Sequence, residues 1–372
     1  MIHEPSPVNN ELLYQLSLTL INGIGPVQAK QLIEHFGNAE NIFKAKKKEL
    51  GLIENIGEIR AKQIKDFDNF KEAENEINFC EKHHIETLFI TDKNYPQRLL
   101  NCYDSPTLLF YRGNADLNTS KIISIIGTRN NTDYGKQITE QFIEDIQSQN
   151  LVILSGLAFG IDAIAHKSAV KNNISTVAVL AHGLDIIYPS QHQLLAKEIL
   201  LNGGLLTEFR KNTNPDKHNF PKRNRIVAGM CDATIVIETA VKGGSMITAE
   251  LAYNYNRDVF AVPGKITDNK SGGCLKLIQQ NKAIVFTNAQ EFMHAMGWQQ
   301  KKIVAKKQRE LFIELSDDEK IIVDILKEKE SVGIDEIYFK STLSSSSVAA
   351  AILNLELQNV IAALPGKMYM LL

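Results

Sequence analysis

A chain of 372 residues, of which 44% are hydrophobic and 23% charged, is long enough for two or three packed domains. The formal net charge of −2 excludes a globally basic nucleic-acid coat, so phosphate binding has to come from a local cluster of basic residues. The four cysteines have no metal-ligand spacing, and no apolar run approaches the ~20 residues that span a bilayer. We therefore expect a cytoplasmic protein that has no disulfides, no cofactor and no membrane segment.

The first 84 residues are predicted to form a helical domain. Two apolar helical patterns flank a tight turn at Gly23-Ile24-Gly25, which is typical of a helix-hairpin-helix module, and a weaker copy follows around Gly57. Paired hairpins of this kind present backbone amides to a DNA phosphate, whereas the alternative is a module that only packs. Both interpretations stay open at this point.

Residues 85–298 are predicted to form an extended Rossmann-like domain. From Lys121 to about Val285, β-branched runs alternate with helical patterns, which indicates a doubly wound α/β sheet with mostly parallel strands. Ligands bind such sheets at the carboxyl ends of the strands. We expect the loops there to begin helices whose free amides favour an anion. These loops are Gly127-Thr128-Arg129, Ser155-Gly156-Leu157-Ala158, His182-Gly183 and Gly243-Gly244-Ser245.

The segment KHNFPKRNRIVAG, residues 217–229, places one aromatic ring among basic side chains. Its basic residues are Lys217, Lys222, Arg223 and Arg225. Such charges repel one another unless an anion binds, and Phe220 offers a base a stacking face. Pro221 disfavours helical backbone at Phe220, which predicts an extended, partly exposed loop there.

Two arginines of this segment flank Asn224. On an early helical turn, Arg223 and Arg225 point apart, so one would face an anionic ligand while the other holds a carboxylate. The candidate carboxylates are those of Glu208 and Glu238. The sequence leaves open which arginine does which.

The rest of the chain is predicted to be a basic linker, residues 299–315, and a winged helix, residues 316–372. The winged helix begins with two helices, the second near Ile334 to Phe339. A longer helix follows, and then a hairpin that turns at Pro365-Gly366-Lys367. The longer helix, Ser344 to Asn359, contains no Lys or Arg, which opposes contact with a phosphate backbone. A protein-contact or regulatory role is therefore favoured over groove reading.

Taken together, these segments resemble the DNA processing protein A family, DprA or Smf. The resemblance rests on the motifs IIGTRNNTDYG, LSGLAFGIDAIAH, VLAHGLDIIYP, FPKRNRIVAG, GGSMITAELA and VPGKITDNKSGGCLKLI. It implies that the Rossmann-like domain binds single-stranded DNA without sequence preference, between a sterile-alpha-motif-like helical domain and a winged helix. It also implies a non-enzymatic protein that protects incoming strands, loads the RecA recombinase on them in natural transformation, and forms a homodimer through the Rossmann-like domain.

The resemblance also implies a set of DNA-binding residues. In this family a Gly-Ser/Thr-Arg turn and a Lys-x-x-Phe-Pro-x-Arg-Asn-Arg segment form the DNA pocket. Arg129 would then clamp a phosphate, Lys217 would add a second charge, and Phe220 would stack on a base. With the neighbouring loops, the predicted nucleic-acid-binding residues are Arg129, Ser155, Gly156, Lys217, Phe220, Arg223, Asn224, Arg225, Gly244 and Ser245.

The chief alternative is an enzyme. The stretch RNRIVAGMCDATIVIETAVKGGSMITAE is similar in order to the LOG-type nucleotide phosphoribohydrolases, for which Arg225 and Glu250 are the candidate catalytic residues. Ile247 replaces the glycine before Thr248, and the second glutamate of that loop is absent. We therefore interpret this similarity as a shared fold rather than retained catalysis.

Two other chemistries are disfavoured by the sequence. No Gly-x-x-x-x-Gly-Lys-Ser/Thr motif is present, so no ATPase is expected. Asp162 with His166, and Asp185 with His182, have spacings that would suit a metal. A capped helix with a surface histidine is the commoner explanation of both pairs, and we predict no metal site.

Overall fold

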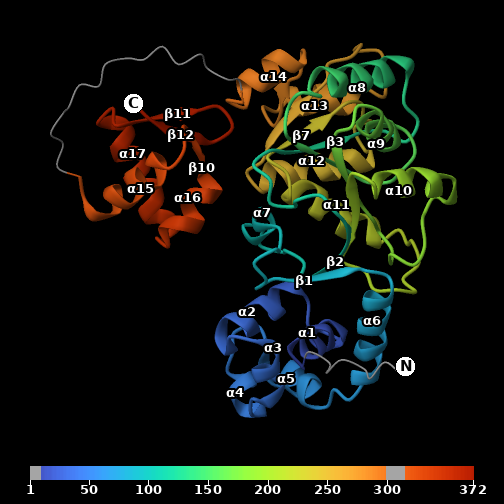
Figure 1. The fold of residues 1–372 in the computed structure, drawn as a ribbon, viewed down its shortest axis with the longest axis vertical. Helices are drawn as coiled ribbons and strands as arrows, with labels where there is room; N and C mark the ends of the chain where they lie inside the picture. The colour runs from blue at the N-terminus through green and yellow to red at the C-terminus, as the bar shows by residue number, and fades with distance from the viewer. Residues whose placement is uncertain (1–9, 299–314) are drawn as a thin grey trace, which may run out of the picture. The chain divides into compact units, whose positions relative to one another are not determined.

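The computed structural model describes residues 10–298 and 315–372 and divides into two compact units, Met1–Val285 and Phe286–Leu372 (Figure 1). All but the last residue of the predicted basic linker, 299–315, lies outside the described residues. No helix in the described part of the chain is long and apolar enough to cross a bilayer. The predicted domain boundaries after residues 84 and 298 stay predictions.

The first unit begins with a group of short helices. They are α1 (Asn10–Leu20), α2 (Pro26–Phe36), α3 (Ala39–Lys44), α4 (Lys47–Gly51), α5 (Gly57–Lys65) and α6 (Phe70–Lys82). Gly23, between α1 and α2, has a φ of 82°, and Gly57, after α4, has a φ of 62°, a conformation that favours glycine. Both predicted hairpin turns are therefore present, and the helices share one hydrophobic core with the sheet that follows.

A single sheet dominates the first unit. Its strands are β1 (Glu86–Phe89), β2 (Leu108–Gly113), β3 (Ile122–Ile126), β4 (Val152–Ser155), β5 (Ser175–Val179), β6 (Gly203–Thr207), β7 (Ala233–Val236), β8 (Asp258–Ala261) and β9 (Ile284–Val285). The order is β1-β2-β6-β5-β4-β3-β7-β8-β9. Strands β1 and β2 join antiparallel and the others pair in parallel, which confirms the predicted mostly parallel sheet.

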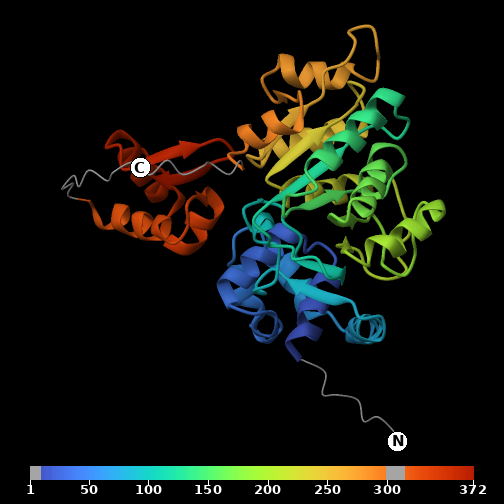
Figure 2. The same ribbon diagram turned by 45° about the horizontal axis from the view of Figure 1, so that its top comes forward.

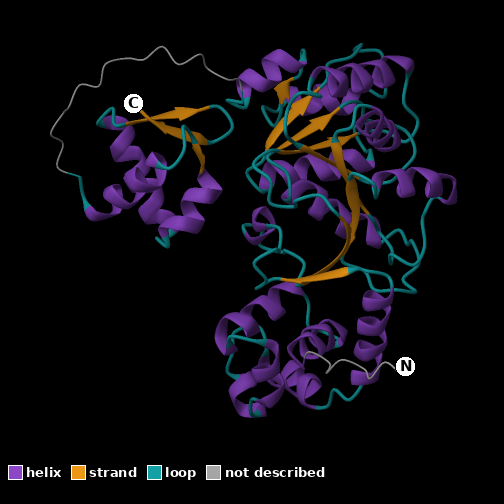
Figure 3. Ribbon diagram, in the orientation of Figure 1, coloured by secondary structure: helices purple, strands orange, loops and turns teal. Residues whose placement is uncertain are grey.

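Helices lie on both sides of these strands (Figure 3). They are α7 (Gln97–Leu100), α8 (Asp133–Asp145), α9 (Ile161–Lys171), the short 3-10 helix η1 (Ser190–His192), α10 (Gln193–Ile199), α11 (Asn219–Gly229), α12 (Gly244–Asn254) and α13 (Gly272–Gln279). After β3 the chain winds through β4 and β5 toward β6, and after β7 it winds the other way. The strand order thus reverses between β3 and β7, which is where such sheets bind ligands.

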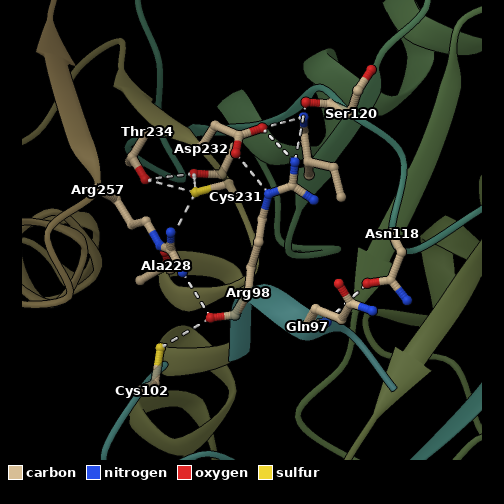
Figure 4. Close-up of polar contacts among 12 residues, drawn as sticks. Gln97, Arg98, Cys102, Asn118, Ser120, Ala228, Cys231, Asp232, Thr234 and Arg257 are labelled. Atoms are coloured by element: carbon tan, nitrogen blue, oxygen red, sulfur yellow. Dashed lines mark hydrogen bonds and ion pairs between the residues drawn. The ribbon is translucent and has the colours of Figure 1, made fainter. Parts of the chain in front are cut away.

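A polar network ties α7 to the amino end of the central strands (Figure 4). Arg98 on α7 forms a two-point ion pair with Asp232, with Nε and Nη2 donating at 2.7 and 3.0 Å. Asp232 also accepts a hydrogen bond from the backbone N–H of Ile122 at 2.8 Å. The Arg257 guanidinium completes the network by donating to the Arg98 carbonyl at 2.7 Å. Because Asp232 joins the start of β3 to α7 and pairs with Arg98, we interpret this cluster as structural.

The second unit contains the winged helix (Figure 2). Its elements are α14 (Ala289–Ala295), α15 (Asp317–Lys327), β10 (Val332–Gly333), α16 (Ile334–Ser341), α17 (Ser345–Leu357), β11 (Ile361–Leu364) and β12 (Met368–Leu371). A three-stranded sheet of order β10-β12-β11 packs with the helices around a small core that includes Ile322, Val348 and Leu355. This confirms the predicted order of helix, helix, helix and hairpin.

Candidate nucleic-acid interface

A cavity of about 520 Å3 opens at the carboxyl ends of the central strands, at the point where the strand order reverses. Its walls come from the loops after β3 and β4, from α11, and from the start of α12. The predicted residues that line it are Arg129, Gly156, Lys217, Phe220, Arg223, Asn224, Gly244 and Ser245. The fold therefore brings residues from four separate segments to one site.

Arg129 and Phe220 meet at the mouth of this cavity. The Arg129 side chain is exposed, and its Cζ lies 5.1 Å from the centroid of the Phe220 ring. Phe220 is half-buried and lies in the first turn of α11, so the prediction of an extended loop was wrong. Pro221 is tolerated there because the first turn of a helix needs no partner for its backbone N–H.

Glu238, just after β7, holds the loop that carries Arg129 by hydrogen bonds. Thr128, on one side of Arg129, donates its backbone N–H to the Glu238 carbonyl at 2.8 Å. Thr132, on the other side, donates its N–H to the Glu238 carboxylate at 2.9 Å and its hydroxyl to the same group. Glu238 is only 2% exposed. It holds a loop rather than an arginine, which corrects one of the two partners considered from the sequence.

Arg223 is a buried residue of the cavity wall. Its side chain is only 6% exposed and donates to the Val179 carbonyl at 2.9 Å. Burial raises the pKa of the nearby Asp162 carboxyl, and the positive charge of Arg223 opposes that rise. Arg223 Cζ and Asp162 Oδ2 each lie 2.5 Å from where a Cβ on Gly156 would stand, so only glycine fits between them. Arg223 is thus a buried cation with protein partners.

Two predicted residues do not line the cavity, in contrast to the expectation. Ser155 is fully buried and donates its hydroxyl to the Ile125 carbonyl at 2.6 Å. Arg225 binds the Glu208 carboxylate and lies 3.8 Å from the Asp104 carboxylate. Of the two arginines that flank Asn224, Arg225 is therefore the one that binds a carboxylate considered from the sequence, that of Glu208, whereas Arg223 lies near the Asp162 carboxylate.

The histidines considered for a metal are buried, so the expectation of surface histidines was wrong. His166 contacts the Thr176 hydroxyl at 2.8 Å and the Gly156 carbonyl at 2.6 Å, and burial lowers its pKa to about 4. His182 bonds the Gly183 carbonyl at 2.9 Å, and this loop does not begin a helix, because η1 starts only at Ser190. Among residues 10–298 and 315–372, no group of three His, Cys, Asp or Glu residues could hold a metal ion.

The sequence analysis did not identify two aromatic residues near the cavity. Phe159, after β4, and Tyr188, after β5, are 45% and 47% exposed. Together with Phe220 and Arg129 they line a smaller space of about 30 Å3. The available signal was an aromatic residue shortly after the glycine of each strand-end loop, Phe159 after Gly156 and Tyr188 after Gly183.

The two residues of the enzymatic alternative do not meet in the cavity. Glu250 forms an ion pair with Lys282 at 3.4 Å, and Arg225 is engaged by Glu208. Neither side chain lines the 520 Å3 cavity. This arrangement does not favour the phosphoribohydrolase interpretation.

The predicted roles of the winged helix and of the N-terminal helical domain stay predictions. Helix α17 carries no Lys or Arg, and Ala349, Ala350 and Leu353 are exposed on it. That surface suits a protein contact better than a phosphate backbone. The N-terminal helices share one hydrophobic core with the sheet, and DNA contact by their hairpins stays a prediction.

Comparison with known proteins identifies related sequences along most of the chain. Residues 86–297 match the model of DNA recombination-mediator protein A, residues 309–367 a DprA winged helix domain, and residues 16–67 a SAM-like helix-hairpin-helix tandem. Protein Smf of Synechocystis is 33% identical over 397 aligned residues, covering 97% of this chain and 99% of the relative. DNA processing protein DprA of Streptococcus pneumoniae is 42% identical over 204 residues, covering 55% of this chain and 72% of the relative.

Solved structures give the same result. DNA processing protein A of Streptococcus pneumoniae has a TM-score of 0.62 at 32% identity and covers 77% of this chain and 98% of its own. The protein of the same name from Helicobacter pylori, solved for its single-stranded DNA binding mode, has a TM-score of 0.52 at 33% identity, covering 56% and 94%. The chain therefore belongs to the DNA recombination-mediator protein A family, DprA or Smf.

Proposed function

We propose that this protein binds single-stranded DNA, without sequence preference, in the 520 Å3 cavity at the carboxyl edge of the sheet. The observation that carries the proposal is the meeting of the cations Arg129, Lys217 and Arg223 with the half-buried ring of Phe220. A cationic groove with an aromatic stacking surface is the general design of such sites. The Helicobacter pylori relative, solved for its single-stranded DNA binding mode, supports the same assignment.

Each group has a distinct part in the proposed binding. Exposed Arg129 and Lys217 bind phosphates. The start of α12, at Gly244 and Ser245, adds the partial positive charge of a helix N-terminus. Arg129 lies over the Phe220 ring. A cation–π contact at an exposed site is worth about 0.5–1 kcal/mol, less than the ~1.5–3 kcal/mol of a hydrogen bond to a charged group. Arg129 can therefore leave the ring for a phosphate and free Phe220 for a base.

The stacking role of Phe220 can be tested by removing its ring. We expect Phe220→Ala to weaken binding of an oligo-dT strand by ~1–3 kcal/mol, or about 5- to 150-fold, because every base has a face to stack. Phe220→Trp should retain most of the affinity. Fluorescence anisotropy of a labelled strand measures both variants, and the same titration with duplex DNA serves as the reference. A wild-type preference for the duplex would overturn the proposed function.

We propose further that the protein is not an enzyme, protects the bound strand, and passes it to the RecA recombinase as a homodimer. Membership of a family described as recombination mediators supports this proposal. Light scattering should give a mass near twice the 41.6 kDa of the chain. RecA should hydrolyse ATP sooner on a strand precoated with a single-stranded DNA-binding protein when this protein is added. No acceleration with wild-type protein would contradict the proposed loading role.

A further inference from the structure

We propose that Phe159 and Tyr188 form a second base-stacking surface beside Phe220, so that a bound strand continues across this surface after leaving the main cavity. The inference rests on the proposed function and adds a binding subsite to it. Its basis is the position, exposure and support of the two rings.

The two rings adjoin the cationic cavity directly. Phe159 is 45% exposed and Tyr188 47% exposed, and both line one space with Phe220 and Arg129, so the rings form a group rather than lying singly on the surface. The Tyr188 and Phe220 ring centroids lie 6.4 Å apart, about twice the ~3.4 Å step along a DNA strand. The space between the rings is only about 30 Å3, so bases would stack on the exposed rings rather than enter it. Arg129 lines both spaces, which makes them one continuous surface.

Buried histidines contact the Phe159 ring and the backbone of Tyr188. The His192 ring packs edge-on against Phe159 at 4.9 Å, and its Nδ1 contacts the Leu157 carbonyl at 2.8 Å. The backbone N–H of Tyr188 donates to Nε2 of His182 at 3.2 Å. Burial lowers the pKa of His182, so the neutral ring keeps an acceptor for that bond. The Phe159 ring is packed and the backbone that carries Tyr188 is fixed, so both lose less freedom on binding, which is the advantage of a preorganised stacking surface.

The occupant is the same strand that the main cavity binds. Arg129 provides a positive charge at the junction, and stacking on aromatic rings accepts any base. An apolar peptide would bring no negative charge to pair with the adjoining cations. The expected ligand is therefore one or more further nucleotides of single-stranded DNA.

The test measures affinity against strand length. Wild-type protein, Tyr188→Ala and Phe159→Leu are titrated with labelled oligo-dT strands of increasing length. We expect both variants to bind the shortest strand normally and to lose at least fivefold on the longer ones, since stacking of the added bases is removed. Tyr188→Phe should restore wild-type affinity because it keeps the ring. Tyr103→Ala is the matched control, since Tyr103 is 70% exposed and lines neither space.

The possible outcomes separate this inference from the proposed function. Wild-type affinity of Tyr188→Ala and Phe159→Leu at every length, with binding still lost in Phe220→Ala, would overturn the second stacking surface alone. Failure of the wild-type protein to bind any strand would overturn both. Thermal melting of each variant verifies that the fold is intact.

Discussion

Charge reversal at Arg129 is expected to cause the largest loss of DNA affinity of any exposed substitution in this protein. Arg129→Glu removes a charge-assisted hydrogen bond to phosphate, worth about 1.5–3 kcal/mol, and adds a repulsive carboxylate at the mouth of the cavity. We expect oligo-dT affinity to fall roughly 100-fold or more, or about 2.8 kcal/mol. Anisotropy titrations at low and moderate salt measure the effect.

The salt dependence distinguishes a phosphate contact from a folding defect. Each phosphate contact to a single strand contributes about −0.7 to the slope of log affinity against log salt, so Arg129→Ala should flatten the slope by about that amount. Arg112→Glu is the control, because Arg112 is exposed on β2 and lines neither cavity. An equal loss in the two charge-reversed variants would mean that Arg129 acts only through net charge.

The main fold could be predicted because its central strands have a strong local pattern. The β-branched runs that became β3, β4 and β5 are almost entirely buried, so their sequences are mainly apolar. Strand β6, with the sequence GGLLT, was not recognised because glycines weaken the strand signal. Its place in the sheet is fixed by pairing with β2 and β5, which no local pattern shows.

The candidate site was predictable as a set of loops but not in its contacts. Arg129 was identified in a strand-end loop, because parallel strands bring their carboxyl ends to one edge, and Phe220 was identified as the one aromatic residue among the basic side chains of residues 217–229. Arg223 lies near Asp162, and Arg225 binds Glu208. Tertiary packing brings both carboxylates to the site. A helix-period argument states that the two arginines diverge and cannot state which carboxylate each one meets.

Removal of the buried Arg223 charge is expected to cost most of all in stability. Arg223→Met would leave the Asp162 carboxyl, 7% exposed, without the positive charge that opposes the rise of its pKa most. Breaking a buried charge pair costs about 3–5 kcal/mol, a large part of the ~5–15 kcal/mol that stabilises a typical domain. Urea denaturation should show this loss. The double variant Arg223→Met/Asp162→Asn should recover most of it, because no charge is then left unpaired.

The cost of Arg223→Met should also depend on pH. Burial already raises the pKa of Asp162 above its unfolded value of about 3.9, and loss of Arg223 raises it further. A group with a raised folded-state pKa destabilises the fold as pH increases through that pKa, because the folded state then has to release a proton that it holds more tightly. The deficit relative to wild type should therefore be larger near pH 8 than near pH 5. Arg223→Lys, which keeps the charge, should show a smaller deficit with little pH dependence. If the Arg223→Met deficit were the same at both pH values, the carboxylate that Arg223 stabilises would not be Asp162.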